Sequence, residues 1–221
     1  MLQRKQFNLA FLDLTAGETS ENDILVMLHG YGSNEKDLIQ LAPLLDRSMR
    51  FISVRAPERL DHEMYGWFPL EFTPQGVTAD RDAAREAEKT LAVFLHRVLE
   101  AYKPGGGKLW LMGFSQGAIM SYLTALTEPS LLHGVIALSG QFPDPALPGA
   151  SDPETFRSIP FLVVHGLYDE VLPVTNGRVA EKWLTGKTDD LTYREYPVGH
   201  AIHPETPAFL DEWLAAKRTV A

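Results

Sequence analysis

Residues 113–117, Gly-Phe-Ser-Gln-Gly, constrain the fold more than any other part of the chain. They follow the apolar run 108–112, which we expect to be a strand, and precede the apolar run 118–123, which we expect to be a helix. A serine at such a tight turn has a strained backbone, so the residues two positions to either side must be small, and both are glycine. Although the pentapeptide alone also occurs in ordinary glycine-rich turns, its position here predicts a nucleophile elbow that presents the hydroxyl of Ser115 above a sheet.

The rest of the chain alternates between short apolar runs and amphipathic stretches, which predicts a parallel sheet covered by helices on both faces. With 221 residues and 45% hydrophobic content, we expect one α/β domain over residues 1–221. The expected strands are 7–14, 24–28, 50–55, 108–112, 134–138, 161–165 and 191–196, and the expected helices are 34–45, 78–102, the run after the elbow, 173–186 and 204–217.

The stretch 56–78 is too apolar for a linker and too broken by proline and glycine for a long element. We expect it to be a lid-like insertion that lines a groove beside the elbow. For any single apolar residue of this stretch, packing in the core under a loop is as well supported as a place in the substrate groove. The candidate substrate-binding residues are Trp67, Phe68, Phe72 and, on the same rim, Leu172.

Composition excludes several classes of site and partner. The 20 Lys and Arg against 29 Asp and Glu give a net charge of −9, which would repel nucleic acid. The absence of cysteine excludes disulfides, thiolate metal sites and a cysteine nucleophile. No signal peptide pattern and no apolar run of about 20 residues is present, so we expect a cytoplasmic protein without stable membrane insertion.

A serine nucleophile needs a base that accepts its proton and an acid that orients the base. In this architecture the chain order is serine, acid, histidine. Asp169 follows the predicted strand 161–165 and is the preferred acid, because Asp is the commoner third member of such triads. Glu170 is the competitor, and a turn or helix-capping role is the structural alternative for Asp169.

The base should follow the last strand, where two histidines stand before the final helix. His200 is preferred because it follows a glycine and lies nearer the strand end. His203 precedes Pro204, which restricts its backbone. His29 and His165 end predicted strands, and we expect them to bond to nearby loops.

Four runs, 28–32, 113–118, 165–173 and 199–202, together resemble the phospholipase/carboxylesterase family, which includes bacterial carboxylesterases and acyl-protein thioesterases. The resemblance implies an α/β-hydrolase fold and a triad of Ser115, Asp169 and His200. It also implies that the backbone N–H groups of Tyr31 and Gln116 form the oxyanion hole. Most family members have leucine where this chain has Tyr31, so here a ring and a hydroxyl lie beside the acyl site.

The leading hypothesis is a serine hydrolase of small-molecule carboxylic esters that needs no cofactor and no metal, since no histidine pair has zincin spacing. Tyr31 and the acidic surface favour neutral esters of short to medium acyl chains over long-chain acyl-CoA. The alternatives are an acyl-protein thioesterase or lysophospholipase on the same triad, and a hydrolase-shaped protein that binds a ligand without turnover. A homodimer is retained as a candidate assembly.

Overall fold

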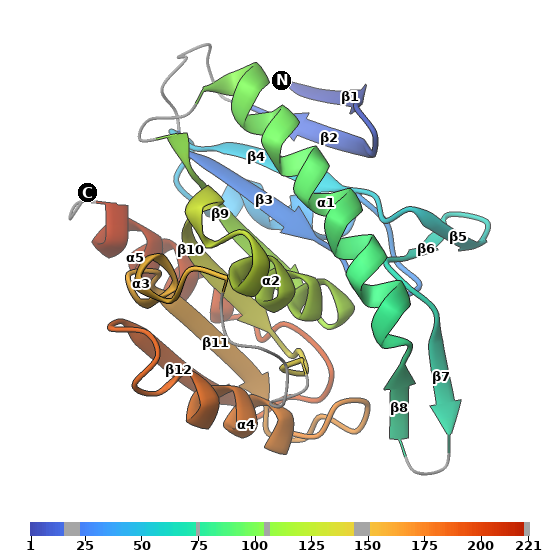
Figure 1. Cartoon of the computed structure of the whole chain (residues 1–221), viewed down its shortest axis with the longest axis vertical. Coiled ribbons are helices and arrows are strands. Elements are labelled where there is room, and N and C mark those ends of the chain that lie inside the picture. Colours follow the sequence, from blue (N-terminus) through green and yellow to red (C-terminus); the bar gives the residue numbers. More distant parts are fainter. Residues whose placement is uncertain (16–22, 74–75, 104–106, 144–150, 219–221) are drawn as a thin grey trace.

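An eight-stranded, mostly parallel sheet runs through the centre of the computed structural model (Figure 1), which describes residues 1–15, 23–73, 76–103, 107–143 and 151–218. The strand order is β1-β2-β4-β3-β9-β10-β11-β12. The pairs β1/β2 and β2/β4 are antiparallel and the other neighbours are parallel. The strands are β1 (Leu2–Gln6), β2 (Ala10–Leu14), β3 (Ile24–Leu28), β4 (Arg50–Val54), β9 (Leu109–Phe114), β10 (Leu132–Leu138), β11 (Phe161–Gly166) and β12 (Leu191–Tyr196).

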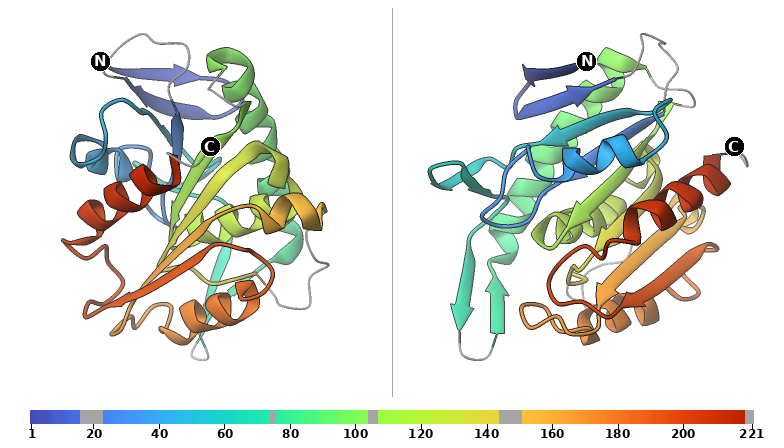
Figure 2. Two further views of the ribbon diagram at one scale, coloured as in Figure 1. Left: turned by 90° about the vertical axis from the view of Figure 1, so that its left-hand side faces the viewer. Right: turned by 180° about the vertical axis from the view of Figure 1, so that it is seen from behind.

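Helices cover both faces of the sheet (Figure 2). On one face lie α1 (Arg81–Tyr102), α2 (Gln116–Thr127) and α4 (Thr175–Leu184), and on the other lie the 3-10 helix η1 (Leu38–Leu44) and α5 (Thr206–Arg218). Two short elements, η3 (Pro129–Leu131) and α3 (Pro153–Arg157), complete the helices of the described residues. None of the helices in the described ranges is long and apolar enough to cross a membrane.

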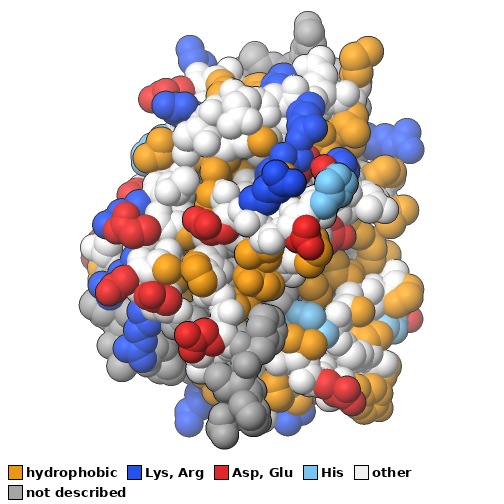
Figure 3. Space-filling model, turned by 90° about the vertical axis from the view of Figure 1, so that its right-hand side faces the viewer, with side chains coloured by type: hydrophobic (Ala, Val, Ile, Leu, Met, Phe, Trp, Pro, Cys, Tyr) orange, Lys and Arg blue, Asp and Glu red, His pale blue; other side chains and the backbone are white. Residues whose placement is uncertain are grey.

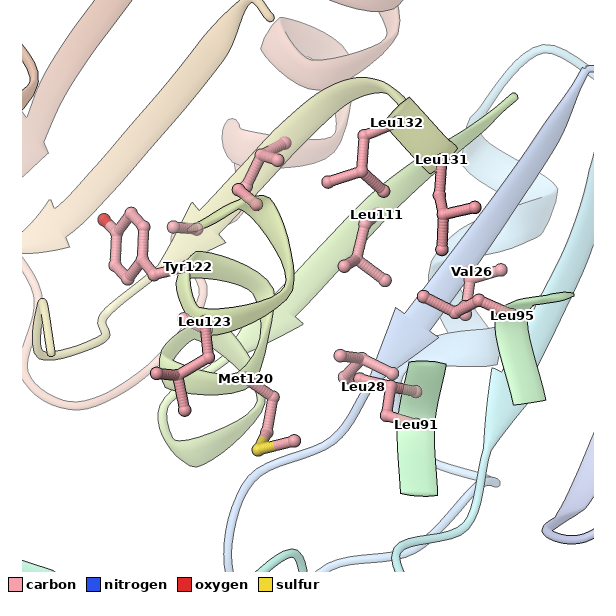
Figure 4. Packing of buried hydrophobic residues seen from close by; sticks show 14 of the residues in the cluster. Val26, Leu28, Leu91, Leu95, Leu111, Met120, Tyr122, Leu123, Leu131 and Leu132 are labelled. Atoms are coloured by element: carbon pink, nitrogen blue, oxygen red, sulfur yellow. The ribbon is translucent and has the colours of Figure 1, made fainter. Parts of the chain in front are cut away.

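Burial on both faces explains why the central strands are continuous apolar runs. Every residue of β3 is buried, and successive side chains enter opposite cores: Val26 and Leu28 pack with α1 and α2, whereas Leu25 and Met27 pack with η1 and α5. Figure 4 shows the first core, where α1 lies against β3. Each such leucine contributes about 1.5–3 kcal/mol when fully removed from water.

Two predicted elements near the N-terminus differ in the structure. The expected strand 7–14 is shorter in the structure, because residues 7–9 form a turn and only β2 is extended; β2 forms a hairpin with β1, a strand that was not expected. The expected helix 34–45 is only the 3-10 helix η1, which contains Pro43 and therefore lacks one backbone donor. The side chain of Asn34 accepts a hydrogen bond from the Lys36 N–H and does not pair with Asp37 as a helix cap.

The irregular stretch 56–78 forms short antiparallel ladders at the end of the sheet where α1 begins. β5 (Glu58–Asp61) pairs with β6 (Met64–Gly66), and β7 (Leu70–Thr73) pairs with β8 (Gly76–Ala79). Because β8 includes Thr78, the following helix starts later than expected, with Asp80 accepting hydrogen bonds from the N–H groups of Asp82 and Ala83. The side chain of Phe72 lies outside the described part of the structure.

Candidate active site

The strand-to-helix turn between β9 and α2 has the strained geometry that the pentapeptide predicts. Ser115 has φ 55° and ψ −116°, a conformation that non-glycine residues rarely adopt. A Cβ atom at Gly113 would lie 2.1 Å from the carbonyl oxygen of Gly117, and one at Gly117 would lie 2.0 Å from that of Leu28. Both positions therefore accept only glycine, and the serine is held in place by close backbone packing.

Ser115, His200 and Asp169 form one continuous series of hydrogen bonds. The Oγ–H of Ser115 donates to His200 Nε2 over 2.9 Å, and His200 Nδ1–H donates to Asp169 Oδ2 over 2.7 Å. The second oxygen of Asp169 accepts from the N–H groups of Val171 at 3.0 Å and Leu172 at 2.8 Å. Because the Asp169 side chain is fully buried, these contacts fix its orientation. Such an arrangement can remove a proton from the serine and stabilise the resulting imidazolium.

The competing residues lie elsewhere. The ring of His203 stacks on Tyr196 at a centroid distance of 4.5 Å, and its Nδ1 accepts from the N–H of Glu205. Glu170 is exposed. Of the two histidines and two acids considered from the sequence, the structure brings His200 and Asp169 to the serine.

Three segments meet at Gln116, the first residue of α2. As the first residue of a helix, it has a backbone N–H without an intrahelical acceptor. Its buried side chain accepts from the Trp67 N–H at 2.8 Å and donates to the Phe68 carbonyl at 2.7 Å. The indole N–H of Trp67 in turn donates to the carbonyl of His29 at 2.9 Å. These bonds tie the turn after β3, which carries Tyr31, to the elbow.

The two other strand-end histidines make the loop contacts expected of them. Nε2 of His29 accepts from the Ala56 N–H at 3.1 Å, so its proton is on Nδ1, which donates to the Gly30 carbonyl. Burial lowers the pKa of His29, against the effect of that last bond, and keeps the ring neutral. Nε2–H of His165 donates to the Leu172 carbonyl at 2.7 Å and lies 3.5 Å from Asp169 Oδ2.

A cavity of about 600 Å³ opens beside Ser115 and His200. Figure 3 shows the face of the molecule at the right of Figure 1, where apolar side chains gather in the middle and charged side chains of both signs surround them. Besides these two residues, the cavity is lined by Tyr31, Phe68, Leu70, Thr78, Arg81, Ala84, Arg85, Gln116, Ile119, Leu123, Gln141, Phe142, Pro143, Val171, Leu172, Asn176 and Val179.

The predicted substrate-binding residues fall into three groups. Phe68 and Leu172 line the cavity. Trp67 does not: it is 1% exposed and packs on His29, so its position is that of a core residue. The side chain of Phe72 is outside the described residues.

Sequence reasoning missed the lining residues from α1, α2 and α4. Ile119 and Leu123 are four residues apart on the elbow helix, a spacing that puts them on one face, but a stripe of this kind is equally typical of core packing. Arg81 and Arg85 have the same spacing on α1, and charged residues so spaced are equally typical of a solvated helix face. In both cases the periodicity defines the face of the helix and leaves open what lies against it.

The described residues contain no cluster of three or more His, Asp or Glu side chains arranged to hold a metal ion. Of the buried side chains at the site, Gln116 bonds to backbone groups and Asp169 bonds to His200 and to backbone N–H groups, whereas Nδ1 of His165 has no hydrogen-bond partner among the described residues.

Comparisons with known proteins bear on the family and the fold of the chain. The sequence model of the family described as Phospholipase/Carboxylesterase matches residues 11–217. The chain is 29% identical over 189 residues to an acyl-protein thioesterase 1 of Gibberella zeae (76% of this chain and 79% of the relative), and 29% identical over 196 residues to the esterase YpfH of Escherichia coli (84% and 79%). A crystal structure of the Bacillus cereus carboxylesterase superposes with a TM-score of 0.82 at 21% identity, covering 95% of each chain.

Proposed function

The chain belongs to the phospholipase/carboxylesterase family and has the α/β-hydrolase fold, and from this premise we propose that it is a serine hydrolase of carboxylic esters that works through an acyl-enzyme. The resemblance predicted from the four sequence motifs is confirmed at the level of family and fold. The observation that carries the proposal is the hydrogen-bonded series from Ser115 through His200 to Asp169 at the wall of a cavity.

In the first half of the reaction, Ser115 Oγ attacks the ester carbonyl and its proton passes to His200 Nε2. The carbonyl oxygen becomes an oxyanion, for which the N–H groups of Tyr31 and Gln116 are the proposed donors. Collapse of the tetrahedral intermediate breaks the bond to the alcohol, which takes the proton from His200 and leaves. A water molecule then gives a proton to His200 and attacks the acyl-serine; as the bond to Ser115 Oγ breaks, His200 returns the proton to that oxygen and the carboxylic acid is released.

Substitution of the nucleophile tests the proposal. We expect Ser115→Ala to leave the fold intact and to lower kcat on 4-nitrophenyl esters by about 10⁴- to 10⁶-fold. A fluorophosphonate probe should label the unaltered protein on Ser115 alone, and Ser158→Ala, which removes an exposed hydroxyl bonded to the Thr155 carbonyl, should be labelled normally. Labelling of a different serine would overturn the assignment. Ligand binding without any labelling or turnover would favour the non-enzyme alternative.

The proposed acyl group is short to medium in length. Each added methylene should change kcat/KM by no more than about 1 kcal/mol of transition-state stabilisation until the cavity is filled, after which the rate should fall. A series of 4-nitrophenyl esters run beside an acyl-CoA series measures this. A maximum at palmitoyl esters or palmitoyl-CoA would contradict the proposal.

The second candidate is a thioesterase on the same three residues. It is favoured by one observation: the relative named acyl-protein thioesterase 1 is as similar to the chain, at 29% identity, as the relative named esterase. The same chemistry cleaves both bonds, because only the leaving atom differs. A matched oxygen ester and thioester of one acyl chain, compared by kcat/KM, separate the two candidates.

Several features of the sequence-based interpretation remain proposals. They are a single domain over residues 1–221 with 56–78 as a lid-like insertion, a cytoplasmic location, a homodimer, and the absence of nucleic acid and of stable membrane insertion from its interactions. Limited proteolysis in the presence and absence of a phosphonate inhibitor would test the insertion, because a segment that closes over the acyl site should become protected.

A further inference from the structure

The cavity beside Ser115 has a charge opposite to that of the whole chain. The sequence carries a net charge of −9, with 29 acidic residues against 20 basic ones. The residues that line the cavity nevertheless include two arginines, Arg81 and Arg85, and no Asp or Glu among the described residues. Because charged walls focus the electrostatic field inside a cleft, the local potential at the substrate is set by these arginines more than by the net charge.

Both arginines lie in the first two turns of α1. They are four residues apart, a separation that puts two side chains on the same face of a helix, and Ala84 between them also lines the cavity. The N–H groups at the amino end of this helix donate to the side chain of Asp80, which precedes Arg81 and does not line the cavity. A small side chain beside two long cationic ones leaves room for a ligand group to approach the guanidinium groups.

The acidic residues of the same helix do not cancel this charge from within the cavity. Asp82 and Glu86 do not line it, and Glu86 pairs with Lys89 at 2.6 Å. Arg85 is exposed, and the ion pairs formed among the described residues do not include it. Its guanidinium is therefore available to a ligand that enters the cavity.

We propose that the preferred ester carries a second, oxyanionic group, a carboxylate or a phosphate, which binds to Arg81 and Arg85 while the ester carbonyl lies at Ser115. This inference rests on the proposed function and specifies its substrate class. It reverses the expectation of neutral esters that the net charge suggests. Arginine suits the role because its planar guanidinium donates two parallel hydrogen bonds to a carboxylate or phosphate.

The first arm of the test places the anion on the acyl side. It compares 4-nitrophenyl hydrogen adipate with 4-nitrophenyl hexanoate, which share the leaving group and the acyl length and differ in the terminal carboxylate. The measured quantity is the ratio of kcat/KM for the anionic ester to that for the neutral ester. Ser115→Ala protein supplies the background rate for each compound.

The second arm places the anion on the alcohol side. It compares butyryl glycerol phosphate with glycerol monobutyrate, followed by release of butyrate. A preference in the first arm assigns the oxyanion to the acyl part, and a preference in the second assigns it to the alcohol part. Either result supports the proposal, provided that the preference depends on the arginines.

The variants are Arg81→Gln, Arg85→Gln and the double substitution, with Arg97→Gln as control. Arg97 lies on the same helix, is exposed and does not line the cavity. We expect each single substitution to lower the anionic-to-neutral ratio by about fivefold, mostly through KM, and the double substitution to lower it further, as for charge pairs near a surface. Because both arginines line the cavity, the ratio and not the rate for the neutral ester is the readout, and the ratio of the Arg97→Gln control should change by less than about twofold.

Raising the salt concentration should reduce the wild-type ratio and leave that of the double variant unchanged, because the Debye length falls from about 10 Å at 0.1 M to about 3 Å at 1 M. A ratio that is the same in the wild type and the double variant would overturn the inference while leaving the esterase proposal intact. Absence of turnover of all four esters would instead contradict the proposed function.

Discussion

The molecule contains two buried aspartates whose surroundings differ in kind. Asp13 lies on β2, near one edge of the sheet, with a side chain that is 2% exposed, and Asp169 follows β11 with a side chain that is 0% exposed. Asp13 accepts hydrogen bonds from Arg50 at 2.8 and 2.9 Å and from Lys5 at 2.6 Å. Asp169 accepts from two backbone N–H groups and from His200.

This difference in partners shows that burial of a carboxylate does not by itself indicate a reactive site. The groups that bond to the carboxylate are more informative. At Asp13, burial alone would raise the pKa, but the hydrogen bonds from Arg50 and Lys5 outweigh it and hold the pKa below its ordinary value. That charge is already compensated by permanent cations. Among the described ion pairs, Asp169 pairs only with histidines, so its charge remains available to an imidazolium that forms during a reaction.

The largest effect that tests this comparison is on turnover. We expect Asp169→Asn to lower kcat by about 10⁴-fold, because an amide cannot hold His200 in the tautomer that accepts the serine proton. The melting temperature should change by only a few degrees, since the amide oxygen still accepts the N–H groups of Val171 and Leu172. Glu170→Gln, at the exposed neighbour, is the control and should be fully active. The reverse result would assign the acid to Glu170.

The second effect is on stability at the other aspartate. Asp13→Asn leaves Arg50 and Lys5 without their anion and should cost about 3 kcal/mol of unfolding free energy, or about 6–12 °C in melting temperature. Turnover at 25 °C should be unchanged. Because the folded-state pKa of Asp13 is lowered, the stability that it contributes is present above the ordinary value of 3.8 and is lost as the pH falls through the folded-state pKa.

Denaturant titrations over a range of pH measure this contribution. The difference in unfolding free energy between the wild type and Asp13→Asn should therefore be largest at pH 7 and should decrease below about pH 4. A difference in unfolding free energy that does not change with pH would contradict a stabilising role for the ionised Asp13. A loss of turnover in folded Asp13→Asn protein would contradict the assignment of Asp13 to stability and of Asp169 to turnover.

The sequence predicted most of the fold because its strongest signals are local. The continuous apolar run at β3 and the glycine-flanked turn at Ser115 reflect burial and backbone strain, which each depend on a few adjacent residues. The exposed strand β1 left no such signal, since none of its residues is fully buried. Pro43 shortened a helix whose apolar spacing was otherwise regular.

The candidate site was less predictable because it depends on contacts between distant segments. Motif order was enough to select Asp169 and His200, whose roles remain proposals. It could not show that Trp67 is used in the core and bonded to His29, because that contact joins residues 38 positions apart. Nor could net charge predict two arginines at the cavity, since a sum over the whole chain contains no information on location.

An intermediate effect is expected at Gln116, which belongs to the site through its backbone and to the fold through its side chain. Gln116→Met keeps the length of the side chain but removes its bonds to Trp67 and Phe68. We expect kcat to fall by about tenfold with little change in KM, because the turn that carries Tyr31 is then less firmly fixed to the elbow.

Trp67→Phe is the companion variant, because it removes the indole N–H that donates to the His29 carbonyl, together with part of a buried ring. It should also lower kcat, by a smaller factor than Gln116→Met does. The double variant should show a non-additive loss, since both bonds belong to one connected set. An increase in KM at constant kcat in Gln116→Met would mean that the side chain affects substrate binding rather than the position of the donors.

The smallest effect concerns another buried carboxylate, Glu88 of α1, which forms no ion pair among the described residues. Among the described residues, its one side-chain hydrogen-bond donor is the hydroxyl of Thr127, at 2.6 Å. Burial raises the pKa of Glu88 against the effect of that hydroxyl, and nearby Glu128 raises it further. A buried carboxylate that has no ion-pair partner should lower the free energy of unfolding when it is ionised at neutral pH. This is the opposite of the effect expected for Asp13, which is paired with two cations.

Glu88→Gln should therefore stabilise the protein, by less than about 1 kcal/mol at pH 7, because the amide can keep the bond to Thr127 without carrying charge. The sign follows from the raised pKa: the folded state binds the proton more tightly than the unfolded state, so wild-type stability falls as the pH rises from the ordinary value of 4.5 through the folded-state pKa. The stability advantage of the variant should thus be largest at neutral pH and should vanish towards pH 4.

Glu86→Gln, at an exposed position of the same helix, is the control and should shift the unfolding midpoint by little at any pH. If Glu88→Gln were instead destabilising at pH 7, the ionised carboxylate and its bond to Thr127 would be worth more than its burial costs, and a single neutral hydroxyl would count as a sufficient partner for a buried charge.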